Sequence, residues 1–448
     1  PNHPEEPQLL VIDVPKFHLF IDPESISLPH KEIIAAEILK IIPGQDALKI
    51  KEAFYKKSRN RKLLTWLEKE HKEKILSWWQ PYAKKNRLPL NALYLTLDYK
   101  RSYPFGSLLG QVLHTVQDEK DPYSLQSLPT GGMEMYFNDY LQGRQGSSLF
   151  MRSPGHSLDL GKVLQEPENG ADIYLTINHW LQAIVEEELA KGVQKSAGKG
   201  GWAIVMDPYT GEILALAQYP FFDVRRYRQF FNSPERAECT RVKAVQDAFQ
   251  PGSIFKPITL ALALRANEEL QKKGIKPLFS PAAKMPTGDS RFPGRSKPLK
   301  DGRLHHFLNM SMALQKSSNV YMARLMQKMI EAFGDMWVKK QLEELFGFGQ
   351  KTGIELPAEA PGLVPMPGRL HPNGTLEWSL ATPYSLAIGH NILVNSIQML
   401  RAFAIIANGG YVVQPTLLKK ITRTGAVIVD NTNRQMGKRV LSENSCFE

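Results

Sequence analysis

The chain has 448 residues, of which 42% are apolar and 23% are charged, a globular composition that excludes a mostly disordered, collagen-like or coiled-coil protein. At roughly 150 residues per domain, this length predicts two or three domains. The 56 lysines and arginines exceed the 45 aspartates and glutamates by 11. That excess favours anionic partners such as nucleic acid, an acidic membrane surface or a carboxylate-rich polymer, but simple solubility explains it equally well.

The two cysteines, Cys239 and Cys446, exclude a disulfide scaffold, and neither lies in an array typical of a zinc module. They do not identify the cellular compartment. The longest uncharged stretch, residues 378–400, is broken by proline, histidine and amide side chains, so we expect soluble structure there and no membrane-spanning helix. The chain begins at Pro1 without a signal-type apolar region, so either the protein is soluble as synthesised or an N-terminal segment has been left out.

Three segments of the N-terminal part have distinct patterns. Residues 9–21 alternate well enough to predict a strand. Residues 51–85 combine leucine and tryptophan with many lysines and glutamates, which predicts a pair of surface helices with a solvated charged face; a membrane-lying or partner-binding role is the alternative. Residues 152–172 contain proline and glycine at both ends and lack helical periodicity, so we place an interdomain connection there, with domains at residues 1–160 and 161–448.

The next segments predict an ordered α/β region. Residues 172–176 read as a strand, and Asn178 is a suitable N-cap for a helix from His179 to about Ala190. The apolar runs 202–206 and 212–217 flank turn residues, which predicts a hairpin. Asp207 is the only carboxylate within that turn, which is too few to hold Mg²⁺ or Ca²⁺ without other ligands, so we expect a structural turn.

The most informative string begins a helix rich in alanine and leucine after Gly252. Ser253 and Lys256 are three residues apart, so they share one face of a helix. A serine nucleophile needs an adjacent base, and lysine can serve when burial or a positive neighbour lowers its pKa. Pro257 has no N–H to donate to the Ser253 carbonyl, so we expect an irregular first turn. An S-x-x-K motif alone is weak, since it occurs by chance in most proteins of this length.

A second motif follows about sixty residues later. Ser317 and Asn319 form an S-x-N triplet before another amphipathic helix. A hydroxyl and an amide from a separate element suit an acyl-transfer site, where they relay a proton and hold a peptide substrate. A serine N-cap of the helix is an equally good explanation of this triplet in isolation.

Taken together, ordered motifs along nearly the whole chain resemble those of class B penicillin-binding proteins, the monofunctional transpeptidases of peptidoglycan synthesis. Arg101 to Gly106 (RSYPFG) is similar to the R-x-Y-P-x-G element of that family. Gly132 to Glu134 and Leu141 to Gly146 are similar to its G-x-E and L-x-G-x-x-G stretches. The matching strings that follow in order are LTINHWLQ, MDPYTGEILALAQYPFFD, FQPGSIFKP, KSSNV and IANGG.

The resemblance implies a mixed α/β (α+β) fold, with an elongated N-terminal pedestal domain and a penicillin-binding transpeptidase domain whose antiparallel sheet is flanked by helices. It implies that Ser253 attacks the penultimate D-Ala of a stem peptide and that Lys256 accepts its proton. Ser317 would pass that proton to the leaving D-Ala, and Asn319 would bind the peptide backbone. No cofactor or metal is implied.

The partners that the resemblance implies are peptidoglycan stem peptides, β-lactam antibiotics and membrane proteins of the division or elongation machinery, and no nucleic acid. The catalytic domain would lie on the extracytoplasmic side of the bacterial cell membrane, on an anchor that this sequence lacks. Septal or lateral-wall synthesis, the acceptor amine and the oligomeric state stay open. The alternatives are a serine β-lactamase or β-lactam sensor, and a non-enzymatic scaffold of the cell-wall machinery.

Two departures from the family pattern affect the site. Lys351-Thr352-Gly353 reads as the K-T-G motif, but it lies among glycines and a proline and precedes IANGG, so we interpret it as a different family segment. The true motif is expected beyond Glu448, and we therefore expect this chain to be truncated at both ends. A smaller departure concerns the local turn geometry and not the chemistry: Gly389-His390-Asn391 and Asn395-Ser396 stand where relatives more often have G-x-G and T-P.

Overall fold

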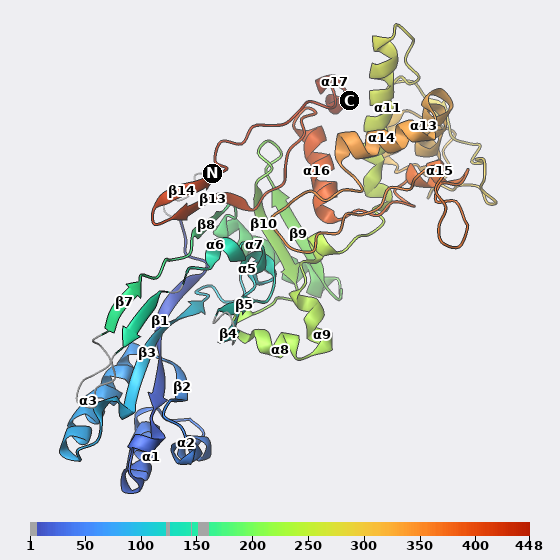
Figure 1. Cartoon of the computed structure of the whole chain (residues 1–448). Coiled ribbons are helices and arrows are strands. Elements are labelled where there is room, and N and C mark those ends of the chain that lie inside the picture. Colours follow the sequence, from blue (N-terminus) through green and yellow to red (C-terminus); the bar gives the residue numbers. More distant parts are fainter. Residues whose placement is uncertain (1–6, 122–125, 145, 151–160) are drawn as a thin grey trace.

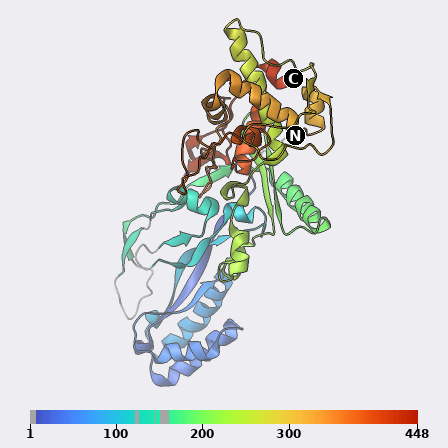
Figure 2. The same cartoon turned by 90° about the vertical axis from the view of Figure 1, so that its right-hand side faces the viewer.

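The computed structural model describes residues 7–121, 126–144, 146–150 and 161–448. The molecule is elongated, with an N-terminal arm that ends in helices and a broader C-terminal body at the opposite end (Figure 1). A view from the side shows the same separation of the two ends (Figure 2). The elongated N-terminal domain and the mixed α/β architecture that the sequence predicted are confirmed.

The arm consists of a three-stranded antiparallel sheet covered by helices. Its strands are β1 (Ile12–Ile21), β2 (Arg61–Leu67) and β3 (Leu93–Ser102), and β1 lies in the centre. Its helices are α1 (Leu28–Ile41), α2 (Ala47–Tyr55) and α3 (Lys69–Lys85). Leu19, Ile34, Phe54 and Trp79 form the buried core between sheet and helices. The strand expected at residues 9–21 is therefore confirmed.

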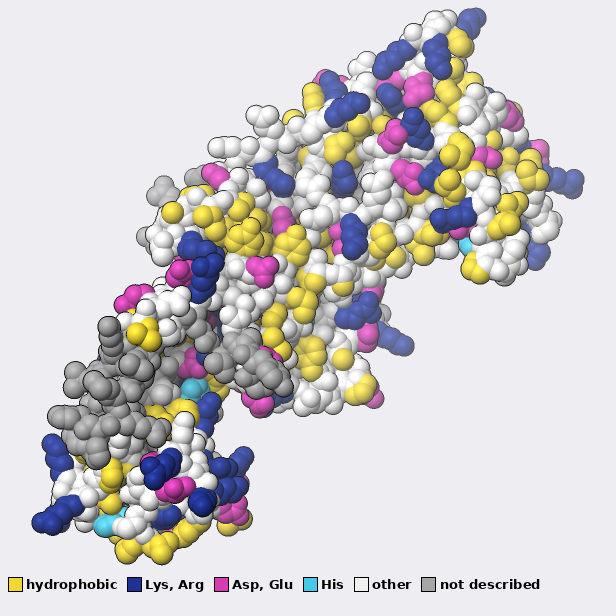
Figure 3. All heavy atoms as spheres, viewed as in Figure 1, with side chains coloured by type: hydrophobic (Ala, Val, Ile, Leu, Met, Phe, Trp, Pro, Cys, Tyr) yellow, Lys and Arg dark blue, Asp and Glu magenta, His cyan; other side chains and the backbone are white. Residues whose placement is uncertain are grey.

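The helix pair predicted for residues 51–85 is wrong in its middle, because Arg61–Leu67 forms the edge strand β2. Leu64 and Leu67 are buried there, and their spacing of three fits a helix as well as an irregular strand. Pairing with β1 decides the matter, since it satisfies the backbone groups of the segment and buries both leucines. The lysines and arginines of this region lie on the surface at the tip of the arm (Figure 3).

Small elements join the arm to the body. They are α4 (Gly110–Leu113), β4 (Val116–Lys120), β5 (Ser127–Pro129), α5 (Gly132–Tyr136), α6 (Asn138–Leu141), β6 (Ser147–Phe150) and β7 (Gly161–Gln165). Arg101 at the end of β3 forms ion pairs with Glu134 of α5 at 2.9 Å and with Asp13 at 2.9 Å. Arg101 of the R-x-Y-P-x-G element thus contacts Glu134 of the G-x-E element. Part of the connection expected at residues 152–172 lies outside the described residues.

The lower part of the body is built on two small antiparallel sheets. Its elements are β8 (Asp172–Leu175), α7 (His179–Lys195), β9 (Gly201–Met206), β10 (Ile213–Tyr219), β13 (Leu418–Arg423) and β14 (Ala426–Asp430). The Asn178 side chain accepts the N–H groups of Trp180 and Leu181, so the predicted N-cap is confirmed. The predicted hairpin is also confirmed as β9–β10, and Asp207 accepts the Tyr209 N–H within its turn.

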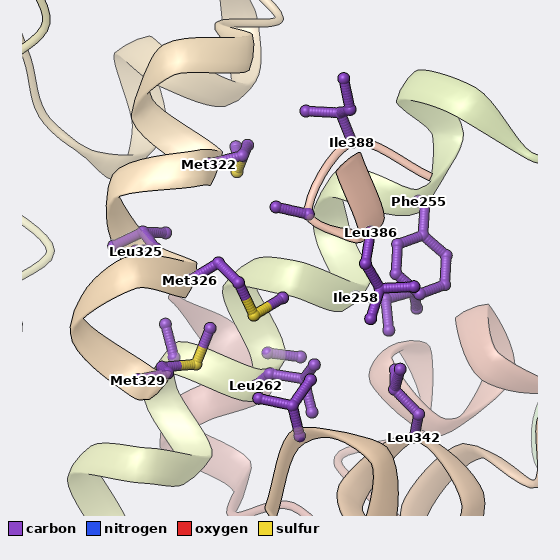
Figure 4. Close-up of a cluster of buried hydrophobic side chains, with 14 of the residues drawn as sticks. Phe255, Ile258, Leu262, Met322, Leu325, Met326, Met329, Leu342, Leu386 and Ile388 are labelled. Atoms are coloured by element: carbon purple, nitrogen blue, oxygen red, sulfur yellow. The ribbon is translucent and has the colours of Figure 1, made fainter. Parts of the chain in front are cut away.

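The upper part of the body is helical. It contains η5 (Gly252–Phe255), α11 (Lys256–Lys272), α12 (Met310–Gln315), α13 (Asn319–Phe333), α14 (Asp335–Phe346), α15 (Thr382–Leu386), α16 (Ser396–Ala407) and α17 (Glu443–Phe447). Leu262 of α11, Met326 of α13 and Leu342 of α14 point toward one another in its core, together with Leu386 (Figure 4). Each such side chain contributes roughly 1.5–3 kcal/mol on burial. This packing holds the first residues of α11 and α13 at a constant separation.

The remaining short elements complete the body. They are η3 (Val224–Arg226), α8 (Tyr227–Phe231), α9 (Pro234–Ala237), η4 (Glu238–Thr240), α10 (Lys243–Gln246), β11 (Met285–Pro286) and β12 (Phe307–Leu308). Within the described ranges, no helix combines the length and the apolar character needed to cross a membrane. In those ranges there is also no group of three or more histidine, cysteine, aspartate or glutamate residues placed to hold a metal ion.

Candidate active site

Ser253 lies in the short 3₁₀ helix η5 that leads directly into α11. The irregular first turn expected from Pro257 is therefore confirmed, and the Lys256 N–H donates to the Ser253 carbonyl in the 3₁₀ pattern. Gly252 has a φ of +60°, and its N–H donates to the Gly389 carbonyl at 3.0 Å. Phe255 is fully buried in the core (Figure 4). These contacts hold the turn against the core, and the Ser253 side chain is exposed.

Lys256 is almost fully buried, with 1% of its surface exposed. Its Nζ donates to the Ser317 carbonyl at 2.6 Å, to Ser317 Oγ at 2.9 Å and to Asn319 Oδ1 at 2.8 Å. Three of the four residues singled out in the sequence are thus joined by direct hydrogen bonds. The fourth, Ser253, is one turn away along the chain, and its hydroxyl is hydrogen-bonded to none of the residues that the structure describes.

The protonation of Lys256 is governed by two opposing effects. Burial lowers the pKa of its ammonium, while the carboxylate of Asp301 acts in the opposite direction, and the pKa ends below its ordinary value. A lowered pKa brings the neutral amine closer to physiological pH, and only the neutral amine can accept a proton. The environment of Lys256 therefore suits a general base.

The turn between α12 and α13 assigns different contacts to its two serines. Ser318 is the N-cap of α13, because its Oγ accepts the Tyr321 N–H at 3.1 Å. Ser317 has a φ of +51°, a left-handed conformation that costs a non-glycine residue about 1–2 kcal/mol, and it contacts Lys256. The N-cap interpretation of this motif thus applies to Ser318, whereas Ser317 is the serine that contacts Lys256.

Sequence reasoning missed Lys300 and Asp301, which lie against the same turn. Asp301 accepts hydrogen bonds from the Ser318 hydroxyl at 2.6 Å and from the Asn319 N–H at 2.6 Å. The Lys300 carbonyl accepts the Asn319 side-chain amide at 2.8 Å. Both residues lie in an irregular segment without periodicity, so no sequence pattern points to them.

Lys351-Thr352-Gly353 lies in a loop and not in a strand. Thr352 is buried, and its N–H and hydroxyl donate to Glu359 Oε1 at 2.7 and 2.6 Å. The Gly353 N–H donates to the second oxygen of the same carboxylate at 3.0 Å. The Lys351 side chain is exposed and has no ion pair with any described residue. Thr352 and Gly353 therefore close a loop around Glu359.

The two substituted turns keep ordered geometry. Asn391 has a φ of +59°, which asparagine tolerates better than most residues with a side chain. Asn395 caps α16, since its side chain accepts the Gln398 N–H and the Gln398 side chain accepts the Asn395 N–H in return. The chain thus meets the backbone requirements of both turns with asparagine.

Comparison with protein families places two matches along the chain. Residues 5–175 match the penicillin-binding protein dimerisation domain, and residues 201–447 match the penicillin-binding protein transpeptidase domain. Together they cover most of the sequence in the order that the motifs predicted.

Individual relatives agree with these matches. The chain is 27% identical over 335 residues to the probable peptidoglycan D,D-transpeptidase PbpC of Pseudomonas aeruginosa, which covers 74% of this chain and 53% of that protein. It is 25% identical over 457 residues to the probable peptidoglycan D,D-transpeptidase PenA of Neisseria meningitidis, which covers 98% of this chain and 66% of that protein. The chain thus spans about half to two thirds of the length of these curated relatives.

Solved structures show the same fold. Penicillin-binding protein 2X from Streptococcus thermophilus superposes with a TM-score of 0.73 at 20% identity, covering 98% of this chain and 62% of that one. A peptidoglycan synthetase from Bifidobacterium adolescentis superposes with a TM-score of 0.66 at 23% identity, covering 98% of this chain and 76% of that one.

Proposed function

The chain belongs to the penicillin-binding protein transpeptidase family, and we propose that the protein is a serine D,D-transpeptidase that cross-links peptidoglycan stem peptides through an acyl-enzyme. The observation that carries this proposal is the hydrogen-bonded cluster of buried Lys256 with Ser317 and Asn319, one helical turn from exposed Ser253. A buried lysine with a lowered pKa, three residues from an exposed serine, can supply the base that a serine nucleophile needs.

In the proposed reaction, Ser253 Oγ attacks the carbonyl carbon of the penultimate D-Ala while neutral Lys256 accepts the hydroxyl proton. The bond to the terminal D-Ala breaks, and its nitrogen receives the proton through Ser317 Oγ, which lies 2.9 Å from Lys256 Nζ. Asn319 positions the peptide backbone. The amine of a second stem peptide then attacks the ester carbonyl and loses a proton to Lys256, and the Ser253 oxygen leaves and takes that proton back as the amide bond forms. Backbone N–H groups, including that of Ser253, stabilise the oxyanion.

We also propose the remaining properties that the family resemblance implies. Its partners would be stem peptides, β-lactam antibiotics and membrane proteins of the division or elongation machinery, and it would act on the extracytoplasmic side of the cell membrane. The similarity to the peptidoglycan D,D-transpeptidase FtsI of Escherichia coli supports peptidoglycan as the substrate. The proposed boundary between the domains lies near residue 160, and the pairing of β8 with β13 supports a C-terminal domain that begins soon after it.

The test is acylation of the full-length protein by a labelled penicillin, followed by mass spectrometry of the peptides. We expect one adduct, on the peptide that contains Ser253, and none in the Ser253→Ala variant. An undiminished adduct in that variant would refute the assignment. Release of the label within seconds would instead identify a β-lactamase, and the absence of any adduct would favour a non-enzymatic scaffold.

A further inference from the structure

The dipeptide Lys300-Asp301 is attached to the start of α13 by four hydrogen bonds. Asp301 accepts from the Ser318 hydroxyl at 2.6 Å and from the N–H groups of Asn319 and Val320 at 2.6 and 3.0 Å. The Lys300 carbonyl accepts from Asn319 Nδ2 at 2.8 Å. One short segment therefore satisfies two free N–H groups of the helix and one of its key side chains.

A carboxylate at a helix N-terminus has an ordinary explanation, because it satisfies free N–H groups and interacts favourably with the helix dipole. In this protein, however, Asn319 is bound by Lys300-Asp301 and by Lys256 at once, and Ser318 directly follows Ser317, which also contacts Lys256. The Asn319 amide is bound on both sides, with its oxygen accepting from Lys256 and its nitrogen donating to Lys300. This pair of contacts determines which end of the amide faces the lysine.

The adjacent residue is strained and needs support. Ser317 has a φ of +51°, and both its carbonyl and its hydroxyl accept from Lys256. A left-handed serine persists only where its surroundings hold it. Lys256 holds the turn through Ser317, and Asp301 holds it through Ser318 and Asn319.

We propose that Asp301 is a positioning residue of the active site, which holds Ser317 and Asn319 in register with Lys256. The proposal rests on the proposed transpeptidase function and adds a residue that acts through others. Loss of the hydrogen bonds to Asp301 would let the turn at Ser317 and Asn319 move relative to Lys256. A displacement of about 1 Å in an active site can reduce a rate about 10²-fold.

Asp301 has a second effect on the same lysine. Among the described residues it is the charged group whose field acts on Lys256, and its negative charge raises the pKa that burial lowers. Removal of the charge should lower the pKa of Lys256 further. The neutral amine would then form at lower pH, so the acid limb of the acylation profile should move to lower pH.

Two variants separate the effect of the hydrogen bonds to Asp301 from the effect of its negative charge. Asp301→Ala removes the hydrogen bonds and the charge, whereas Asp301→Asn keeps an acceptor for the N–H groups and a donor for Ser318 but removes the charge. Asn178→Ala is the matched control, because it deletes an acceptor of two helix N–H groups at 3.1 Å on α7, outside the site. The measurements are the penicillin acylation rate of the full-length protein against pH and the pKa of Lys256 from NMR of labelled lysine.

We expect Asp301→Ala to lower the acylation rate about 10²-fold. Asp301→Asn should recover much of this loss, and the acid limb of its curve of acylation rate against pH should lie at lower pH. Asn178→Ala should keep the acylation rate and pH profile of the parent while it loses thermal stability. If both Asp301 variants acylate at the parent rate with the parent profile, the proposal is refuted. If the parent protein itself is not acylated, the proposed function fails, and NMR of the Asn319 side-chain amide decides the role of Asp301: an unchanged amide signal in Asp301→Ala would overturn it.

Discussion

Gly389 supports the turn that carries Ser253, the proposed nucleophile, and an added methyl group at Gly389 should disturb this turn measurably. Its φ is +75°, and its carbonyl accepts the Gly252 N–H at 3.0 Å. A Cβ atom at this position would lie 2.2 Å from the Gly252 carbonyl oxygen and 2.8 Å from Phe255 Cβ. Both contacts are far below van der Waals separation, so Gly389→Ala must push η5 and Ser253 away.

The magnitude follows from two contributions. A left-handed alanine costs about 1–2 kcal/mol, partly offset by the about 0.4–1 kcal/mol that alanine gains by restricting the unfolded chain. Overpacking adds about 1–3 kcal/mol, because the neighbour here is backbone and cannot rotate aside. We expect Gly389→Ala to lower the free energy of unfolding by about 2–4 kcal/mol, equivalent to about 5–15 °C in Tm.

Gly274→Ala is the matched control, since Gly274 follows the C-terminal end of α11 with a φ of +71° and its Cβ would meet open space. It should lose only about 1 kcal/mol. Denaturant titration of both variants, with the acylation rate of the full-length protein, separates backbone strain from displacement of Ser253. Equal stability losses in the two variants, with parent-like acylation by Gly389→Ala, would show that the contact between Gly389 and Gly252 does not hold the nucleophile turn.

Three further outcomes are expected. Lys256→Arg keeps the positive charge but cannot act as a base, so acylation should fall by at least about 10²–10⁴-fold, and a rate near that of the parent would place the base elsewhere. Lys351→Ala should leave penicillin binding of the full-length protein nearly unchanged, because Lys351 projects from a loop that Thr352 closes on its own; a large loss would restore this lysine to the site. Burial lowers the pKa of His114 to about 4, so the folded protein binds this proton less tightly than the unfolded chain, and the free energy of unfolding should fall by up to about 3 kcal/mol as pH drops from 6.5 toward 4. Chemical denaturation across this range should show that His114→Gln has a weaker pH dependence, and an identical dependence would mean that another group is responsible.

Several elements could be predicted because local chemistry determines them. The Asn178 cap, the β9–β10 hairpin and the irregular turn at Pro257 depend on residues that are neighbours in the chain. The helix predicted for residues 61–67 was wrong for the opposite reason. Their leucines fit two periodicities, and only pairing with β1, far away in sequence, selects the strand.

The candidate site was predictable in composition but not in arrangement. Ser253, Lys256, Ser317 and Asn319 could be singled out because chemically reactive residues occur at short, fixed spacing. Their contacts depend on how α11 packs against α13, which is a property of the core. Asp301 could not be predicted from the sequence, because it lies in an irregular loop and its role depends on the three hydrogen-bond donors that the fold places around it.

Lys256 shows how the body maintains an unfavourable arrangement. A buried ammonium is costly unless its donors are satisfied, and here three acceptors surround Nζ, two of them from the strained residue Ser317. A hydrophobic residue would suit a position with 1% exposure better, and the left-handed serine would then lose its support from the core. The apolar packing of α11 and α13 offsets these local costs (Figure 4). The same residues that make the site reactive are therefore those that the surrounding core must stabilise.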